Sequence, residues 1–268
     1  MSDPADRDHA RIGGPRGMLS ALRRDWASMW ETPEDRLAAQ VLITAVVLLI
    51  VYAIWGRPFF ISAHLPAVAG WVHWRAEHEY YSALPFFYWG VSSLVIRILI
   101  PLLVIVLWID RRPSDFGYRL RGVTSHAWIY LVMFLVMLPL LTAASFLPAF
   151  QAKYPMYEEA ALGLRHFGLW EIAYGIQFMG VEAFFRGFLT FGLYPRFGYL
   201  SLFIMVVPYA LVHVGKPPIE VFMAVPAGLL LGYLALKSRS WVFGALLHWA
   251  VGITMDALAI WQAGGFRS

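Results

Sequence analysis

The chain has 268 residues, of which 60% are hydrophobic and only 14% charged, whereas soluble domains average about 45–50% apolar and about 25% charged residues. This composition excludes an ordinary soluble domain, and the absence of cysteine excludes disulfides, thiolate metal sites and cysteine nucleophiles. The net charge of +4 comes from basic residues at the ends of apolar segments, which excludes a face for binding nucleic acid. Apolar stretches of about twenty residues predict an all-α, polytopic membrane helix bundle.

Taken in chain order, the elements fall into three parts. Residues 1–36 are polar and arginine-containing, and we expect a cytoplasmic tail in which Met18–Trp30 forms an amphipathic helix on the membrane surface. Residues 37–160 are predicted to form the N-terminal transmembrane helices, and residues 161–268 a core of helices that carries most of the buried polar groups. The bundle has about seven transmembrane helices, predicted at Leu37–Trp55, Leu84–Trp108, Ala127–Leu147, Leu169–Leu193, Leu200–Val214, Val221–Leu236 and Trp241–Trp261.

The basic residues predict how this bundle is oriented. If the N-terminus lies inside, thirteen of the 21 Lys and Arg residues fall in internal segments and six in external ones. The remaining two, Arg97 and Arg186, lie within predicted spans. An excess of positive charge marks cytoplasmic loops, so we expect a multi-pass cell-membrane protein with a cytoplasmic N-terminus.

Ionisable side chains inside a bilayer are costly and are usually kept for function. Glu182 and Arg186 are four residues apart, which puts them on one helix face where they can pair. Arg97 lies in the middle of the second span, and we expect it to pair with Glu171 or another carboxylate across the bundle.

Two histidines on separate predicted spans add chemistry to this carboxylate. His213 ends the fifth span and His248 lies within the seventh, and a Glu–His–His set can activate water with the glutamate as general base. A histidine can stabilise the developing oxyanion. Asp256, eight residues after His248, either orients that imidazole or is an interfacial cap near the outer leaflet. No cofactor is firmly implied, although two imidazoles and one carboxylate leave zinc at Glu182, His213 and His248 as an alternative.

The order of these motifs resembles the CPBP intramembrane proteases, which include the type II CAAX prenyl endopeptidases and the bacteriocin-processing or Abi-like proteins. The resemblance covers about residues 165–260 and depends on Glu182-x-x-x-Arg186-Gly, on Tyr209-x-x-x-His213 and on the later His248. It implies an all-helical core at 161–268 that cleaves peptide bonds with glutamate-activated water. It also implies that the last histidine and a polar partner bind the oxyanion.

The chain departs from the family pattern at three positions. Val181 replaces the first glutamate of the motif, which the family assigns as general base, and Tyr209 replaces a phenylalanine. Gly252 replaces the polar partner expected four residues after His248, a role that Asp256 is expected to fill. Glu220, which follows a Lys216-Pro-Pro turn, is either one member of a charged pair at the water boundary or a substitute for the missing carboxylate.

The sequence therefore predicts an intramembrane endopeptidase that acts on a membrane-associated protein or peptide. The expected catalytic residues are Glu182, His213 and His248, and the supporting residues are Arg186, Asp256 and Glu220. The main alternative is a catalytically inactive scaffold or immunity protein with the same fold, which Val181 favours. A third alternative is a proton-coupled transporter that uses the same groups as a relay. The expected partners are bilayer lipids and a peptide substrate, not nucleic acid.

Overall fold

The computed structural model describes residues 14–71, 73, 75–120 and 124–267. The first thirteen residues of the expected tail lie outside this part of the chain, and the rest begins with α1 (Gly14–Ser28), which overlaps the predicted surface helix. α1 precedes α2 (Pro33–Trp55), whose start is capped by Thr32, because Thr32 Oγ1 accepts from the Asp35 backbone N–H at 3.0 Å. Asp35 also pairs with Arg196, which joins the start of α2 to α10 (Gly192–Phe197).

The N-terminal half is a helical hairpin, in which two long helical segments are joined by two short helices. Between the two long segments lie α3 (Pro58–Ser62), α4 (Leu65–Trp71) and the short turn η2 (Tyr81–Ala83). The returning segment consists of α5 (Leu84–Leu94), the π-helical η3 (Val95–Leu99) and α6 (Ile100–Leu107). The connection that follows contains η4 (Pro113–Phe116) and η5 (Thr124–His126).

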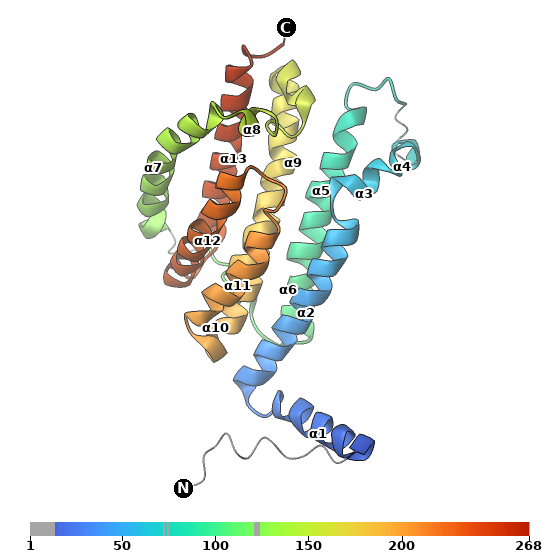
Figure 1. Ribbon diagram of the computed structural model, residues 1–268, viewed down its shortest axis with the longest axis vertical. Helices are drawn as coiled ribbons and strands as arrows, with labels where there is room; N and C mark the ends of the chain where they lie inside the picture. The colour runs from blue at the N-terminus through green and yellow to red at the C-terminus, as the bar shows by residue number, and fades with distance from the viewer. Residues whose placement is uncertain (1–13, 72, 74, 121–123, 268) are drawn as a thin grey trace.

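The C-terminal half is built around α9 (Leu164–Glu182), which packs against α5 on one side and α13 (Val242–Gln262) on the other (Figure 1). The outer helix α7 (Ala127–Ser145) packs on α13, and α8 (Pro148–Gln151) and η6 (Glu158–Leu162) lead into α9. After α9 the chain continues through the π-helical η7 (Ala183–Phe191), α10, α11 (Leu200–Leu211) and α12 (Pro218–Ser238). The described chain contains helices and no strand, as the composition predicts.

Five segments of the described chain are long and apolar enough to cross a membrane. They contain α2, α5–α6, α7, α12 and α13 and match five of the predicted spans. The other two predicted spans are also helical but differ in character. The central segment carries Glu171, Glu182 and Arg186, while α11 has 12 residues, about 18 Å of helix against a hydrocarbon core of about 30 Å. α1 and the C-terminal end of α13 lie at opposite ends of the bundle (Figure 1).

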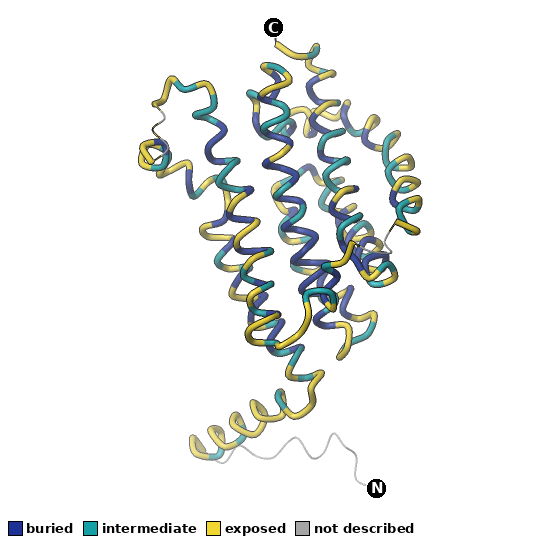
Figure 2. The backbone as a smooth tube through the Cα atoms, turned by 180° about the vertical axis from the view of Figure 1, so that it is seen from behind, coloured by how far each residue is buried: buried dark blue, intermediate teal, exposed yellow. Residues whose placement is uncertain are grey.

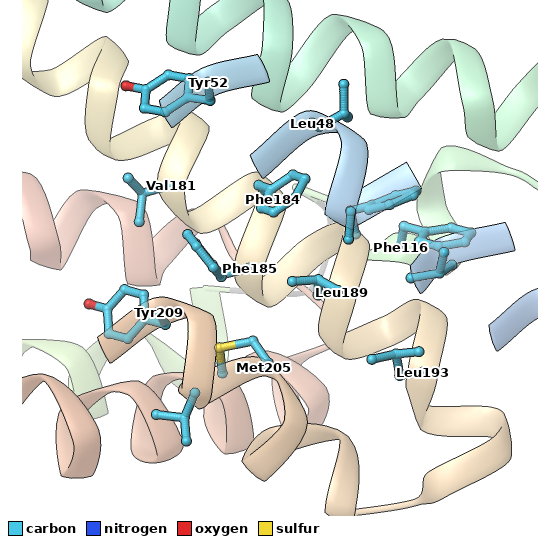
Figure 3. Close-up of a cluster of buried hydrophobic side chains, with 14 of the residues drawn as sticks. Leu48, Tyr52, Phe116, Val181, Phe184, Phe185, Leu189, Leu193, Met205 and Tyr209 are labelled. Carbon is cyan, nitrogen blue, oxygen red and sulfur yellow. The ribbon is translucent and has the colours of Figure 1, made fainter. Parts of the chain in front are cut away.

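The apolar core lies where η7 meets α2 and α11. Phe184 and Phe185 are almost completely buried there, together with Met205 and Tyr209 of α11 (Figure 3). Phe188 belongs to the same cluster and is also buried. Exposed residues instead follow the outward faces of the peripheral helices (Figure 2). Because lipid covers such faces in a membrane, exposed leucine, valine and phenylalanine side chains there are expected.

Close packing of α5 on α9 depends on a glycine, which provides the first prediction. A Cβ atom at Gly180 would lie 2.1 Å from Ser93 Oγ and 3.0 Å from the Ser93 carbonyl oxygen. Gly180→Ala is therefore expected to destabilise the protein by about 1–3 kcal/mol, measured as a lower midpoint of thermal unfolding in detergent. Gly168→Ala is the matched control on the same helix, since a Cβ there meets no atom within 4 Å. Equal unfolding midpoints for the two variants would contradict the packing argument.

Candidate functional site

A buried ion pair lies at the junction of α9 and η7. Glu182 Oε1 is 2.9 Å from Arg186 Nη1, and both side chains have an exposed fraction of zero. The same carboxylate oxygen accepts a hydrogen bond of 2.9 Å from Nδ1 of His248 on α13. Glu182 thus joins two helices, and its charge is balanced by Arg186 inside the protein.

Arg186 is held on its other side by an aromatic ring. Its guanidinium carbon lies 3.9 Å from the centre of the Tyr209 ring, which is the geometry of a cation–π contact. Tyr209 is therefore compatible with the role of the family phenylalanine, since both residues offer an aromatic face. Hydrogen bonds of η7 span five residues instead of four, so this segment is wider than an α-helix.

The two histidines share one feature, the use of Nδ1 for a hydrogen bond within the protein. His213 Nδ1 lies 2.9 Å from the Tyr209 carbonyl oxygen, and His248 Nδ1 lies 2.9 Å from the Glu182 carboxylate. A carbonyl or carboxylate only accepts, so each Nδ1 carries a proton. In a neutral ring, Nε2 then has a free lone pair, and it is the nitrogen left to bind another molecule.

Both histidines line one cavity of about 210 Å³. Both halves of the chain contribute to its walls, which come from α2, α3, α5, η3, α9 and α13, from the connection after α8 and from the loop after α11. Val181 lines this cavity, whereas the neighbouring Glu182 does not. Adjacent residues on a helix point about 100° apart, which places the valine toward the cavity and the carboxylate toward α13.

The position four residues after His248 has no room for a side chain. A Cβ atom at Gly252 would lie 2.6 Å from the Phe178 ring and 3.3 Å from the Tyr174 ring. These rings occupy the space where the resemblance places a polar partner for His248. The Phe178 ring also lies 4.2 Å from the His248 ring, centre to centre.

Asp256 lies elsewhere and contacts a different residue. Its Oδ2 atom accepts a 2.6 Å hydrogen bond from Trp170 Nε1, and the buried Glu171 lies beside it. The partner of His248 Nδ1 is Glu182, so the expected orienting contact from Asp256 is not formed. Eight residues of helix separate Asp256 from His248 by about 12 Å along the axis and by about 80° around it, which is too far for the two side chains to meet.

Glu220, at the start of α12, bonds to residues of two different connections. Its carboxylate pairs with Lys216 and accepts a 2.6 Å hydrogen bond from the Tyr154 hydroxyl. Burial raises the pKa of Tyr154, which lies in the connection after α8, far above its ordinary value, so the phenol stays protonated as a donor. Both carboxylate oxygens of Glu220 therefore have partners other than His213.

Sequence reasoning did not single out Gly244, and it did not predict the contacts that Tyr209 makes in this region. Gly244 lies one turn before His248, and a Cβ there would be 3.3 Å from Glu182 Oε2. Tyr209 contributes both its ring and its carbonyl oxygen. The spacing of Gly244 and His248 on one helix face is the signal that could have identified the glycine.

Arg97 also lines the cavity, and its environment differs from the one expected. Its guanidinium carbon lies 3.6 Å from the centre of the Tyr52 ring. In the described part of the chain Arg97 has no carboxylate partner, although we expected Glu171 or another acid there.

The positions of the carboxylate and imidazole groups can be compared with those of a zinc site. Within the described residues no group of three or more His, Cys, Asp and Glu side chains is placed to hold a metal ion. Glu182 and His248 bond to each other at 2.9 Å, whereas ligands of zinc each point at the ion from about 2.0–2.2 Å.

These features define a polytopic helical membrane protein with a cavity between its two halves that is lined by imidazole and cationic groups among apolar side chains. Residues 164–254 match the family of Rce1-like type II CAAX prenyl endopeptidases, which confirms the resemblance inferred from the motifs. The matched segment runs from α9 into α13 and includes Glu182, Arg186, His213 and His248. No curated protein and no solved structure matches the chain.

Proposed function

We propose that the protein is an intramembrane endopeptidase that hydrolyses a peptide bond of a membrane-associated protein or peptide. The observation that carries this proposal is the Glu182–His248 hydrogen bond beside a cavity that His213 also lines. A carboxylate on Nδ1 and a free Nε2 are what a histidine needs to act as a general base. The match to the endopeptidase family over residues 164–254 supports the same class of reaction.

In the proposed reaction His248 is the catalytic base. Its Nε2 removes a proton from a water molecule in the cavity as the water oxygen attacks the peptide carbonyl carbon. The resulting imidazolium, stabilised by Glu182, then returns the proton to the leaving amine. His213 Nε2 accepts a hydrogen bond from the second O–H group of the water, which stays on the attacking oxygen, and so orients the attack.

Glu182, Arg186 and Tyr209 act as positioning residues in this proposal. The complete burial of Glu182 and its absence from the cavity wall support an indirect role, through His248, in place of direct contact with water. Arg186 pairs with the Glu182 carboxylate and balances its charge, and Tyr209 contacts both Arg186 and His213. Asp256 and Glu220 are assigned structural roles at Trp170 and Lys216.

The proposed domain organisation and orientation follow from the same elements. The segment 161–268 is the catalytic core, the helices of 37–160 close the cavity, and the tail 1–36 lies in the cytoplasm with α1 on the membrane surface. The exposed apolar residues of α1, which include Leu19, Leu22 and Trp26, support contact with lipid.

Hydrolysis can be tested with purified protein in liposomes that contain a pool of single-span hydrophobic peptides. In H₂¹⁸O, cleavage by activated water adds one ¹⁸O atom to each new C-terminus, which mass spectrometry detects. His213→Ala is expected to lower the rate by about 100-fold, because the attacking water loses its second acceptor. Equal cleavage by His213→Ala and the wild type would contradict the proposal.

A second candidate function is favoured by one observation, the presence of Val181 on the cavity wall. Valine accepts no proton, so a protein with this residue at the family's base position can bind a peptide without cleaving it. The candidate is a membrane scaffold or immunity protein that uses the same cavity for peptide binding. Substitution of Val181 separates the two candidates.

A further inference from the structure

Arg97 is a buried cation that neither the ion pairs of the protein nor the proposed reaction uses. Its exposed fraction is 3%, and its Nε and Nη1 atoms are buried without a hydrogen-bond partner in the described residues. It lies before the segment that matches the family, so the matched motifs do not account for it. A buried charge without a counter-ion is costly, so its retention calls for a ligand.

Arg97 lies in an irregular turn of its helix. Pro101 has no N–H group, so the Arg97 carbonyl lacks its usual helical donor four residues later. The helix responds with the π-helical turn η3, in which the Ile100 N–H bonds to the Val95 carbonyl. Such turns occur often at functional sites. The Tyr52 ring under the guanidinium is itself anchored, since its hydroxyl donates to Gln177 Oε1 at 2.9 Å.

The charges on the cavity wall all have the same sign. Arg57, Arg97, Lys153 and Lys216 line it, and among the described residues that do so there is no aspartate or glutamate. Lys216 is neutralised by Glu220, which leaves Arg97 as the most deeply buried of the unpaired cations. The cavity volume of about 210 Å³ is smaller than the roughly 300–1,000 Å³ of typical small-molecule sites, so the cavity admits only part of a peptide.

We propose that Arg97 binds a carboxylate of the peptide substrate that lies within a few residues of the cleaved bond. The carboxylate is either the free C-terminus or an acidic side chain, since both have the planar pair of oxygens that a guanidinium recognises. The small cavity, which also holds both histidines, limits how far this group lies from the reacting carbonyl. The inference rests on the proposed function, because only a protease makes the bound peptide a substrate. Binding of the carboxylate can still be measured without cleavage.

The test measures binding of three hydrophobic hexapeptides to the full-length protein in phosphatidylcholine nanodiscs. One peptide has a free C-terminus, one is its C-terminal amide, and one is the amide with a single internal aspartate. At least one acidic peptide is expected to bind the wild type about 10- to 100-fold more tightly than the plain amide. Which acidic peptide shows this preference distinguishes the C-terminus from the side chain. Arg97→Met is expected to remove the preference and leave amide binding unchanged.

Two controls separate this role from a structural one. Lys153→Met removes a partly exposed cation from the same cavity wall and is expected to change the preference by less than threefold. The melting temperature of Arg97→Met should equal or exceed that of the wild type, because an unpaired buried charge is removed. A variant that loses affinity for all three peptides equally would show a structural role and overturn the proposal.

Two further outcomes also overturn it. One is equal binding of acidic and amide peptides by the wild type. The other is stabilisation of the wild type, but not of Arg97→Met, by phosphatidylglycerol while the acidic peptides have no preference, which would assign Arg97 to a lipid headgroup. If hydrolysis is absent but acid preference depends on Arg97, the proposed protease fails while the carboxylate site stands.

Discussion

His248→Gln is expected to lower kcat/KM for peptide hydrolysis by about 10³-fold in the liposome assay. Glutamine still donates a hydrogen bond to Glu182, so the buried carboxylate keeps a partner. It has no nitrogen that accepts a proton, so the proposed base is lost, and general base catalysis is worth about 10²–10⁴-fold. The effect should appear in kcat more than in KM, because the interaction serves the transition state.

The matched control is His166→Gln. His166 is also buried and bonds the Tyr157 hydroxyl at 3.0 Å, but it does not line the cavity that holds His248. This variant is expected to keep kcat/KM within threefold of the wild type. If His248→Gln also stays within threefold, His248 is not the base.

The role of Glu182 is tested with a double variant, because removal of Glu182 alone leaves Arg186 buried without a counter-ion. Breaking a buried ion pair from one side typically costs about 3–5 kcal/mol, so Glu182→Gln can lose activity by unfolding. The double variant Glu182→Gln with Arg186→Met removes both charges together. It is expected to unfold near the wild-type temperature and still lose about 10³-fold in kcat/KM, because His248 loses the carboxylate that stabilises its charged form.

Val181→Glu is expected to lower kcat/KM for peptide hydrolysis by at least tenfold, which is the second large effect. The new carboxylate would enter the cavity that holds His213 and His248 and accept a hydrogen bond from an imidazole. A histidine that donates Nε2–H to a carboxylate is no longer free to remove a proton from water. Val181→Gln is the matched control, because it has a similar size and adds no charge.

The opposite result would decide between the two candidate functions. A gain of proteolysis from an inactive wild type would mean that Val181 had abolished catalysis and that one carboxylate restores it. The protein would then be the peptide-binding scaffold or immunity protein of the second candidate. Hydrolysis by the wild type, lost on addition of Glu at this position, supports the protease that works through Glu182 and His248.

The helical membrane class and the pairing of nearby polar residues could be predicted from the sequence alone. Apolar blocks of bilayer length identify spans whatever their neighbours are, and a separation of four residues pairs Glu182 with Arg186 within one helix. The motif order identified the family that residues 164–254 match. These are local or one-dimensional properties, so they can be read without coordinates.

Which polar groups from different helices meet depends on how the helices pack. A helix that is apolar all round does not reveal which face meets which neighbour, so the contacts of Arg97 with Tyr52 and of Glu220 with Tyr154 were not predictable. The expected contact between Asp256 and His248 failed because a helix turns 100° per residue, and Glu182 became the partner because α9 and α13 pack together. The cavity itself is formed by both halves of the chain, and such long-range packing has no signature in any single segment.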